Sequence, residues 1–226
     1  MGADRPKQYL SLAGRTLLEW SVQALLADAR VEHVTVVIAP GDDHARRLRL
    51  PARATLADTG GPSRAESVRN GLRALLAQDD DFVLVHDAAR PCLAREELAA
   101  LIDAVDADRR AGDEQGGILA LAVADTLKRE SDGRVGGTVE RAGLWRALTP
   151  QMFRAGLLAR ALESVPDPAA ITDEAAAVER LGFRPRLVAG LASNLKVTTP
   201  QDWALAEAIL RAQGKTPGAT APAHGP

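Results

Sequence analysis

The residues best suited to chemistry stand directly after a short apolar run. Residues 82–85 (FVLV) are followed by His86, Asp87, two alanines and Arg90. A carboxylate at the end of a strand can hold Mg²⁺, because this ion takes one or two carboxylates together with substrate phosphate oxygens. Arg90 can bind a phosphate through both arms of its guanidinium, and Ala88 is small enough to let a base approach the backbone. The alternative is an ordinary strand-to-helix turn, in which Asp87 caps the helix and Arg90 is solvated.

Two lysines and a glycine-rich loop are the next candidates. Lys7 could neutralise charge on a phosphoryl group during its transfer, although alone it is only a surface lysine. Gly61 and Ser67 flank the start of a helix, where free N–H groups can bind a base or a phosphate. An ordinary loop capped by Ser63 explains the same pattern. Lys196 lies in an apolar run, and a lysine on a buried strand needs an anion to face.

The apolar pattern predicts the elements that position these residues. Short apolar runs predict buried strands at 34–39, 82–86 and 117–123, with a possible strand at 54–58 and weaker candidates at 186–188 and 195–197. Amphipathic patterns predict helices at 16–26, 63–77, 95–108, 202–213 and from 172 onwards. This alternation predicts an α/β fold with a doubly wound, mostly parallel sheet. Ligands bind such sheets beyond the carboxyl ends of the strands, where the candidate residues stand. Thr149 and Thr172 are further hydroxyls at element ends, with helix caps as the alternative.

One segment departs from the alternation, and another closes the chain. Residues 125–144 are polar and contain the sequence KRESDGRVGG, which predicts a β-hairpin arm with a glycine turn. An arm this polar buries little against its own domain, so we expect it to reach a partner. We expect one domain over residues 1–213 and a disordered tail over residues 214–226, which contain mainly Gly, Pro, Ala and Thr.

Composition excludes several classes of protein. The formal net charge is -2, whereas nucleic-acid binders usually carry a basic excess. The single cysteine, Cys92, has no neighbouring Cys/His cluster, which argues against structural zinc. No apolar run approaches the roughly 20 residues of a membrane span, and the first ten residues do not resemble a signal peptide. We therefore expect a cytoplasmic protein with no nucleic-acid or membrane partner.

Seven segments occur in an order that resembles the 2-C-methyl-D-erythritol 4-phosphate cytidylyltransferases of the non-mevalonate isoprenoid pathway. The segments are KQYL, RAESVRNGL after the glycine loop, VHDAARP, ADTLKR, TVERAGLWRALTPQ, ITDEA and NLKVT. The resemblance runs from about residue 6 to 210. It implies a Rossmann-like nucleotidyltransferase fold, a homodimer joined through the arm, and a reaction of CTP with methylerythritol phosphate that releases pyrophosphate. A ribitol 5-phosphate cytidylyltransferase of the same fold is the nearest rival.

The resemblance also implies roles for individual residues. Those with catalytic roles are Lys7, Arg141 and Lys196. Those on the nucleotide side are Gly61, Ser67, Ala88 and Arg90. Those on the substrate side are Asp87, Arg90, Thr126, Arg141, Thr149, Thr172 and Lys196. Asp87 is also implied as the Mg²⁺ ligand. Thr126 and Arg141 lie on the arm and would complete the pocket of the neighbouring subunit.

The chain departs from the family pattern at its start. The family begins with a strand and a glycine-rich loop of the form PAAGxGxRMG, and Met1-Gly2 matches only the last two positions. We therefore expect the first strand, the loop and its arginine to be missing through a truncated reading frame. This predicts weak triphosphate binding and low activity for the chain as it stands. A non-catalytic homologue that kept the fold is the alternative.

Overall fold

The computed structural model describes residues 6–215, and these form strands, helices and three short 3-10 turns. The strands are β1 (Ser11–Leu12), β2 (Arg15–Thr16), β3 (Val34–Val37), β4 (Ala54–Ala57), β5 (Phe82–Val85), β6 (Gly117–Ala122), β7 (Leu127–Ser131), β8 (Arg134–Val139), β9 (Trp145–Arg154) and β10 (Arg186–Ala189). The helices are α1 (Leu17–Leu25), α2 (Arg64–Leu75), α3 (Arg95–Arg110), α4 (Ala155–Glu163), α5 (Glu174–Arg180) and α6 (Pro200–Ala212). The 3-10 turns are η1 (Lys7–Tyr9), η2 (Ala45–Arg47) and η3 (Pro168–Ala170).

Local side-chain chemistry fixes where the helices begin. At the start of α1 the Thr16 hydroxyl accepts a hydrogen bond from the Glu19 N–H, and the Glu19 carboxylate accepts one from the Thr16 N–H in return. Ser63 and Glu66 make the same reciprocal pair before α2. Such capping boxes satisfy N–H groups that the first turn leaves unpaired. The predicted starts of both helices are confirmed.

A four-stranded sheet forms the centre of the molecule, in the order β10-β6-β9-β5. β10 runs parallel to β6, whereas β9 is antiparallel to both of its neighbours. The α/β class is confirmed, but the antiparallel β9 was not predicted. Pro150 lies inside β9, and proline argues against a central strand because it lacks an N–H for the ladder. The predicted strand at 195–197 is wrong, since these residues are irregular.

The predicted single sheet is interrupted beside β5. β3 pairs in parallel with β4 to form a separate sheet, and among residues 6–215 neither β3 nor β5 has a second strand partner. Between them lies a cavity of about 760 Å³, lined by both strands and by apolar side chains of α1 and α2. We call this cavity the strand slot. Because each strand has hydrogen-bonding groups on both edges, β3 and β5 each turn one row of such groups toward it.

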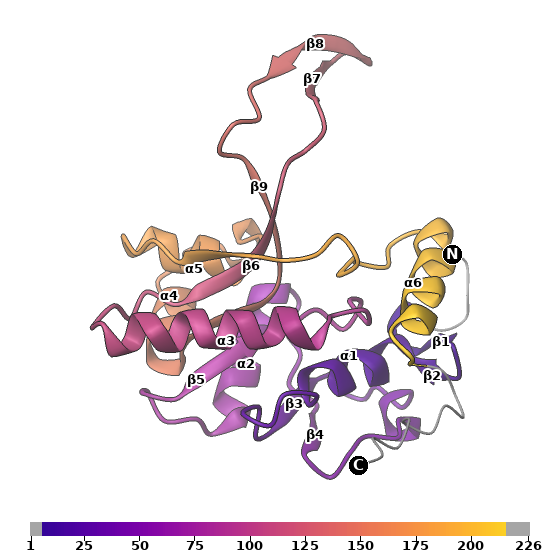
Figure 1. Cartoon of the computed structure of the whole chain (residues 1–226). Helices are drawn as coiled ribbons and strands as arrows, with labels where there is room; N and C mark the ends of the chain where they lie inside the picture. The colour runs from indigo at the N-terminus through magenta and orange to yellow at the C-terminus, as the bar shows by residue number, and fades with distance from the viewer. Residues whose placement is uncertain (1–5, 216–226) are drawn as a thin grey trace, which may run out of the picture.

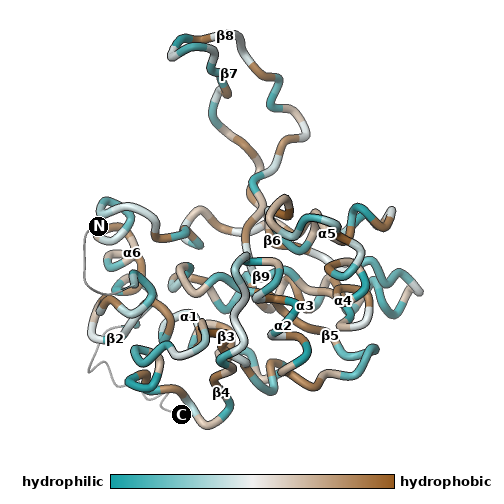
Figure 2. Tube along the Cα trace, turned by 180° about the vertical axis from the view of Figure 1, so that it is seen from behind, coloured by the Kyte–Doolittle hydropathy of each residue, from teal (hydrophilic) through white to brown (hydrophobic). Residues whose placement is uncertain are grey.

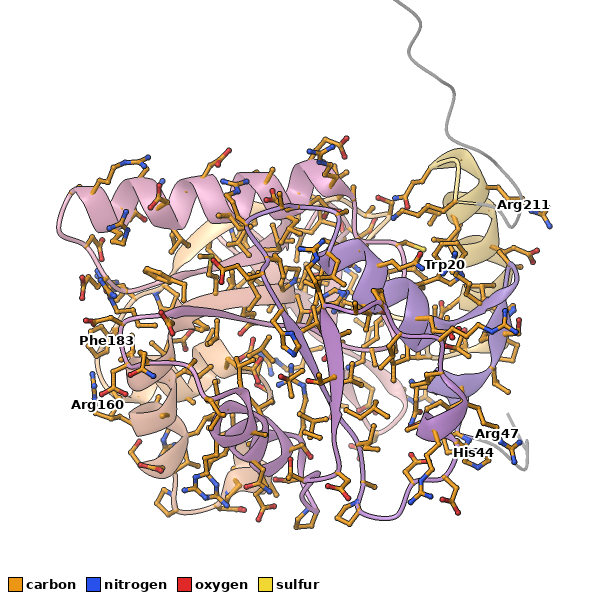
Figure 3. All side chains as sticks on the ribbon, turned by 90° about the horizontal axis from the view of Figure 1, so that it is seen from below. Trp20, His44, Arg47, Arg160, Phe183 and Arg211 are labelled. Carbon is orange, nitrogen blue, oxygen red and sulfur yellow. The ribbon has the colours of Figure 1, made fainter. Side chains whose placement is uncertain are left out.

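Helices cover the sheets and divide the core into three clusters. α1 and α3 pack on one face with β3, and α2, α4 and α5 pack with β5 and β6 on the other. A third cluster joins α6 to Trp20, whose indole N–H donates to the Leu12 carbonyl at 2.7 Å. Seen from below, Trp20 lies on the α6 side, and Phe183 and Arg160 lie at the opposite side (Figure 3).

β7 and β8 form a two-stranded arm that projects from the body (Figure 1). Its turn is made by Asp132 and Gly133, which both have positive φ values, of 51° and 74°. This is the Asp-Gly turn that suits a two-residue hairpin. The arm is mostly hydrophilic with a few apolar positions (Figure 2), and among the latter Val135 is 69% exposed. The predicted arm is confirmed.

Two of the sequence-based expectations concern the chain ends, which the structure describes only in part. Residues 1–5 and 216–226 lie outside the described residues, and they include Met1-Gly2 and most of the expected tail. Within the described part, the chain starts with η1 and the two-residue strands β1 and β2. These two strands pair only with each other and join neither the four-stranded sheet nor the β3–β4 sheet. At the other end, Lys215 follows α6 and donates to the Leu93 carbonyl at 3.2 Å.

Candidate functional site

The loop that follows β5 is held in shape by a chain of hydrogen bonds. The Asp87 N–H donates to the Thr149 hydroxyl oxygen at 3.1 Å, and that hydroxyl lies 2.9 Å from His86 Nδ1. His86 Nε2 lies 3.1 Å from the Arg90 carbonyl, which can only accept, so Nε2 carries the proton and Nδ1 accepts from Thr149. Burial lowers the pKa of His86 to about 4, which keeps the ring neutral near pH 7. This network joins β5 to β9.

Asp87 is surrounded by three cations. Lys196 Nζ lies 3.0 Å from Asp87 Oδ2, and Arg90 Nε lies 3.5 Å from the same oxygen. Arg64 donates to Oδ1 at 3.2 Å. Burial alone would raise the pKa of Asp87, but the charge of Arg64 and the hydrogen bond and charge of Lys196 outweigh it and lower this pKa to about 2. Asp87 is therefore ionised throughout the physiological range.

Arg64 and Glu174 belong to the site but were missed in the sequence. Glu174 is fully buried at the start of α5, and its two carboxylate oxygens accept from Arg64 Nη1 at 2.5 Å and Nη2 at 3.0 Å. Burial raises the pKa of Glu174, and the hydrogen bonds and charge of Arg64 oppose that rise. Arg64 stands in the quoted segment RAESVRNGL and Glu174 in ITDEA, but nothing in the sequence shows that these segments meet.

A pocket of about 250 Å³ opens beside Asp87. The residues that line it are Arg64, Asp87, Arg90, Ala147, Leu148, Thr149, Gln151, Thr172, Asp173 and Lys196. The structure thus brings together five of the predicted residues from four separate segments. Gln151 is fully buried and joins the wall of the pocket to α5, since it donates to Asp173 at 2.9 Å and accepts from the Ala175 N–H at 2.9 Å.

The residues expected on the nucleotide side lie along the neighbouring loops. The Gly61 N–H donates to Ser67 Oγ at 3.0 Å, and the Ser67 hydroxyl donates to the Ser63 carbonyl at 2.9 Å. A Cβ at Gly61 would stand 2.6 Å from the Glu66 Cβ, so the loop has no room for a side chain there. Ser67, Asp87 and Ala88 also line the strand slot, which places one part of its wall at the site.

Lys7 is linked to the loop after β5 through the segment that contains Val197. Its Nζ donates to the Val197 carbonyl at 3.1 Å, and the Val197 N–H donates to the Ala89 carbonyl at 2.8 Å. Lys7 is therefore at the carboxyl end of β5, although it does not line the pocket.

The two arm residues do not join the site of their own chain. Thr126 and Arg141 are exposed, and neither lines the pocket. The Arg141 guanidinium donates to the Ala124 carbonyl across the base of the arm. Within one chain, then, the arm and the pocket are separate.

The site suits a metal ion that brings its own phosphate ligands. Among the described residues, no three His, Cys, Asp or Glu side chains gather where they could hold an ion by themselves. Asp87 offers one ionised carboxylate surrounded by cations, which suits Mg²⁺ only together with polyphosphate oxygens and water.

Residues 6–215 contain no helix that is long and apolar enough to cross a membrane.

Comparison with known proteins decides the family. A family model, IspD, described as 2-C-methyl-D-erythritol 4-phosphate cytidylyltransferase, matches residues 1–212. The chain belongs to this family. A 2-C-methyl-D-erythritol 4-phosphate cytidylyltransferase of Laribacter hongkongensis is 56% identical over 213 residues, covering 93% of this chain and 90% of that protein. The Escherichia coli relative of the same name is 49% identical over 215 residues, covering 93% and 88%.

Solved structures of the family share the fold. A 4-diphosphocytidyl-2C-methyl-D-erythritol synthase superposes with a TM-score of 0.82 at 44% identity, covering 90% of this chain and 94% of that one. The 2-C-methyl-D-erythritol 4-phosphate cytidylyltransferase of Francisella tularensis gives a TM-score of 0.80 at 32% identity, covering 92% and 94%. The family assignment and the Rossmann-like nucleotidyltransferase fold that the resemblance implied are thus confirmed.

Proposed function

We propose that this chain transfers CMP from CTP to 2-C-methyl-D-erythritol 4-phosphate in isoprenoid precursor biosynthesis. An oxygen of the 4-phosphate forms a bond to the α-phosphorus of CTP. The bond from that phosphorus to the oxygen bridging it to the β-phosphorus breaks, and pyrophosphate leaves. The observation that carries the proposal is the pocket beside Asp87, in which three cations surround one ionised carboxylate. Two polyanions must meet in this reaction, so positioning and positive charge supply most of the catalysis.

The cations of the site divide between the two substrates. Lys196 and Arg90 line the pocket and hold the attacking phosphate, with the hydroxyls of Thr149 and Thr172 beside it. Lys7, at the carboxyl end of β5, stabilises charge on the α-phosphate as the new bond forms. The loop that contains Gly61 and Ser67, together with the small Ala88, receives the cytidine.

Mg²⁺ is the cofactor we propose, and Asp87 is the residue that would hold it. When bound, the ion neutralises phosphate charge and polarises the phosphorus that is attacked. Asp87 has a pKa of about 2, so it is an ionised oxygen ligand at any pH at which the enzyme works. Its backbone is fixed by Thr149, which keeps the carboxylate in place as the substrates arrive.

The arm supplies residues to a second subunit. Thr126 and Arg141 are exposed on the arm, apart from the pocket of their own chain. A homodimer in which each arm covers the other subunit's pocket gives both residues a substrate to bind. In this arrangement Arg141 joins Lys196 on the attacking phosphate.

Pyrophosphate release from CTP tests the reaction. We expect release with 2-C-methyl-D-erythritol 4-phosphate and Mg²⁺, at the low rate predicted for the chain as it stands, and less with ribitol 5-phosphate. A preference for ribitol 5-phosphate would replace our assignment with the rival transferase. Calorimetry tests the non-catalytic alternative: a chain that binds neither CTP nor the polyol phosphate in the presence of Mg²⁺, even when extended at its N-terminus, would support that alternative instead.

Mixing two inactive variants tests the shared site. Arg141→Ala disables the arm of a subunit, and Lys196→Ala disables its pocket. If the arm acts on the partner, a mixed dimer holds one intact site, and random mixing restores about a quarter of the wild-type activity. No recovery after mixing, together with a monomeric mass by light scattering, would contradict the shared site.

A further inference from the structure

A buried ion pair lies directly behind the carboxylate of the site. Glu174 is 0% exposed and has both carboxylate oxygens occupied by Arg64. The same guanidinium turns another edge to Asp87 and is one third exposed to the pocket. Arg64 therefore has a fixed orientation, because its fork is held from behind by a partner that no substrate can reach.

The pair connects three segments that are distant in sequence. Arg64 is the first residue of α2, directly after the Gly61–Ser63 loop, and Glu174 is the first residue of α5, directly after Thr172. Asp87 follows β5. One guanidinium thus links the nucleotide-side loop, the metal-side carboxylate and the substrate-side threonine.

We propose that Arg64 is a positioning residue for Asp87, and that Glu174 holds Arg64 in the orientation required for this. The inference rests on the proposed transfer of CMP, since it assigns these residues to the same site. Asp87 Oδ1 is held by Arg64 and Oδ2 by Lys196, so the carboxylate has one orientation and cannot rotate away from the pocket. Glu174 never touches a substrate and acts only through Arg64.

Charged groups from several elements face Asp87. The groups that face it are Arg64 on α2, Arg90 in its own loop, Lys196 before α6 and the neutral His86 beside it, with Asp173 in the same pocket and Glu174 behind Arg64. Arg64→Lys keeps a positive charge beside Asp87 and loses the rigid fork, so it tests the orientation of Asp87 separately from its charge environment.

The experiment combines kinetics with an NMR measurement that needs no substrate. Arg64→Lys and Glu174→Gln are compared with Glu163→Gln, which makes the same chemical change in the exposed Arg73–Glu163 pair between α2 and α4. We expect kcat/KM for the polyol phosphate to fall about 10- to 100-fold in the first two variants, because misplacement by about 1 Å can cost that much. The Glu163→Gln control keeps wild-type values. Rates are measured well below each variant's melting temperature.

A second measurement follows the ¹⁵N–¹H NMR signal of the Arg64 Nε–H, which donates to Asp87 Oδ1 at 3.2 Å. We expect Glu174→Gln to move this signal and to speed its exchange with water, because the guanidinium loses its charged partner, and we expect Glu163→Gln to leave it unchanged. A purely structural role would lower the melting temperature but change neither kcat/KM nor this signal. That result, or equal rates in Glu174→Gln and Glu163→Gln, would overturn the inference. Because the NMR measurement uses the chain alone, it decides the contact between Arg64 and Asp87 even if no variant, including wild type, turns over the polyol phosphate.

Discussion

An apolar strand linked ahead of Met1 should fill the strand slot and stabilise the protein. The first described residues lie near the end of the slot at which β3 and β5 finish. Tyr9 donates to Asp42, which follows β3, at 2.6 Å, and Lys7 donates to Val197, which pairs with Ala89 after β5. A strand parallel to β3 would leave the slot near η1. A flexible linker of about ten residues spans roughly 17 Å, enough to rejoin the chain there.

The size of the effect follows from the lining of the slot. β3 and β5 are each four residues long, and α1 and α2 cover the two faces between them. Four buried apolar side chains contribute about 1.5–3 kcal/mol each. About four hydrogen bonds to the two free edges add about 4 kcal/mol, and ordering four residues costs roughly 6–10 kcal/mol. The free energy of unfolding should therefore rise by about 5 kcal/mol, which raises the melting temperature by about 10–20 °C in a protein of this size.

Thermal unfolding and amide exchange together test the slot. The extension is a short run of valines and isoleucines, and its control has the same length with proline at alternate positions, which cannot complete a ladder. We expect a higher melting temperature and slower exchange in β3 and β5 with the apolar extension alone. Equal melting temperatures for both extensions, or stabilisation without protection of these strands, would refute the reasoning.

Three further predictions concern the site and the sheet. Replacing Lys196 by Met should lower kcat about 10²- to 10³-fold with little change in melting temperature, measured by pyrophosphate release. Since the pKa of His86 is lowered from 6.5 to about 4, the folded state resists protonation of the ring, and the free energy of unfolding should fall by about 3 kcal/mol as pH drops through that window. Denaturant titrations of His86→Gln should lack this fall. Gly116 has φ +75° and its added Cβ would stand 2.5 Å from the Met152 carbonyl, whereas Gly182 has φ +87° with open space around it. Gly116→Ala should therefore destabilise by at least about 2 kcal/mol and Gly182→Ala by about 1 kcal/mol, compared by thermal melts.

Local patterns predicted the parts of the fold that local chemistry determines. The starts of α1 and α2 follow from a hydroxyl and a carboxylate three residues apart, so Thr16 and Ser63 could be read directly from the sequence. β3, β5 and β6 follow from apolar runs bounded by turns. β9 could not be found in this way, because Pro150 interrupts its pattern and its place in the sheet depends on distant partners.

The site was predictable only where the family pattern supplied it. From spacing alone an ordinary turn was the favoured explanation of the residues around Asp87, and only the resemblance implied a site there. Lys196 was expected on a strand, yet its segment is irregular and is held by the bond from Val197 to Ala89. An anion does face it, since Asp87 lies 3.0 Å away, but the buried strand from which that anion was inferred is absent. The Arg64–Glu174 pair joins positions 110 residues apart, and no periodicity in the sequence indicates such a contact.

The different exposures of the three cations give them different tasks. The Arg90 side chain is 11% exposed and also donates to the Asn194 carbonyl, while Arg64 is held by Glu174. Lys196 is the most exposed of the three, at 43%, so solvent screens its ion pair with Asp87 more than it screens those of the two arginines. An incoming phosphate can therefore draw Lys196 away from Asp87 more easily than it can move the two arginines. This makes Lys196 the cation that can follow the attacking oxygen as its charge changes, and it explains how a chain with a net charge of -2 still presents positive charge where the phosphates meet.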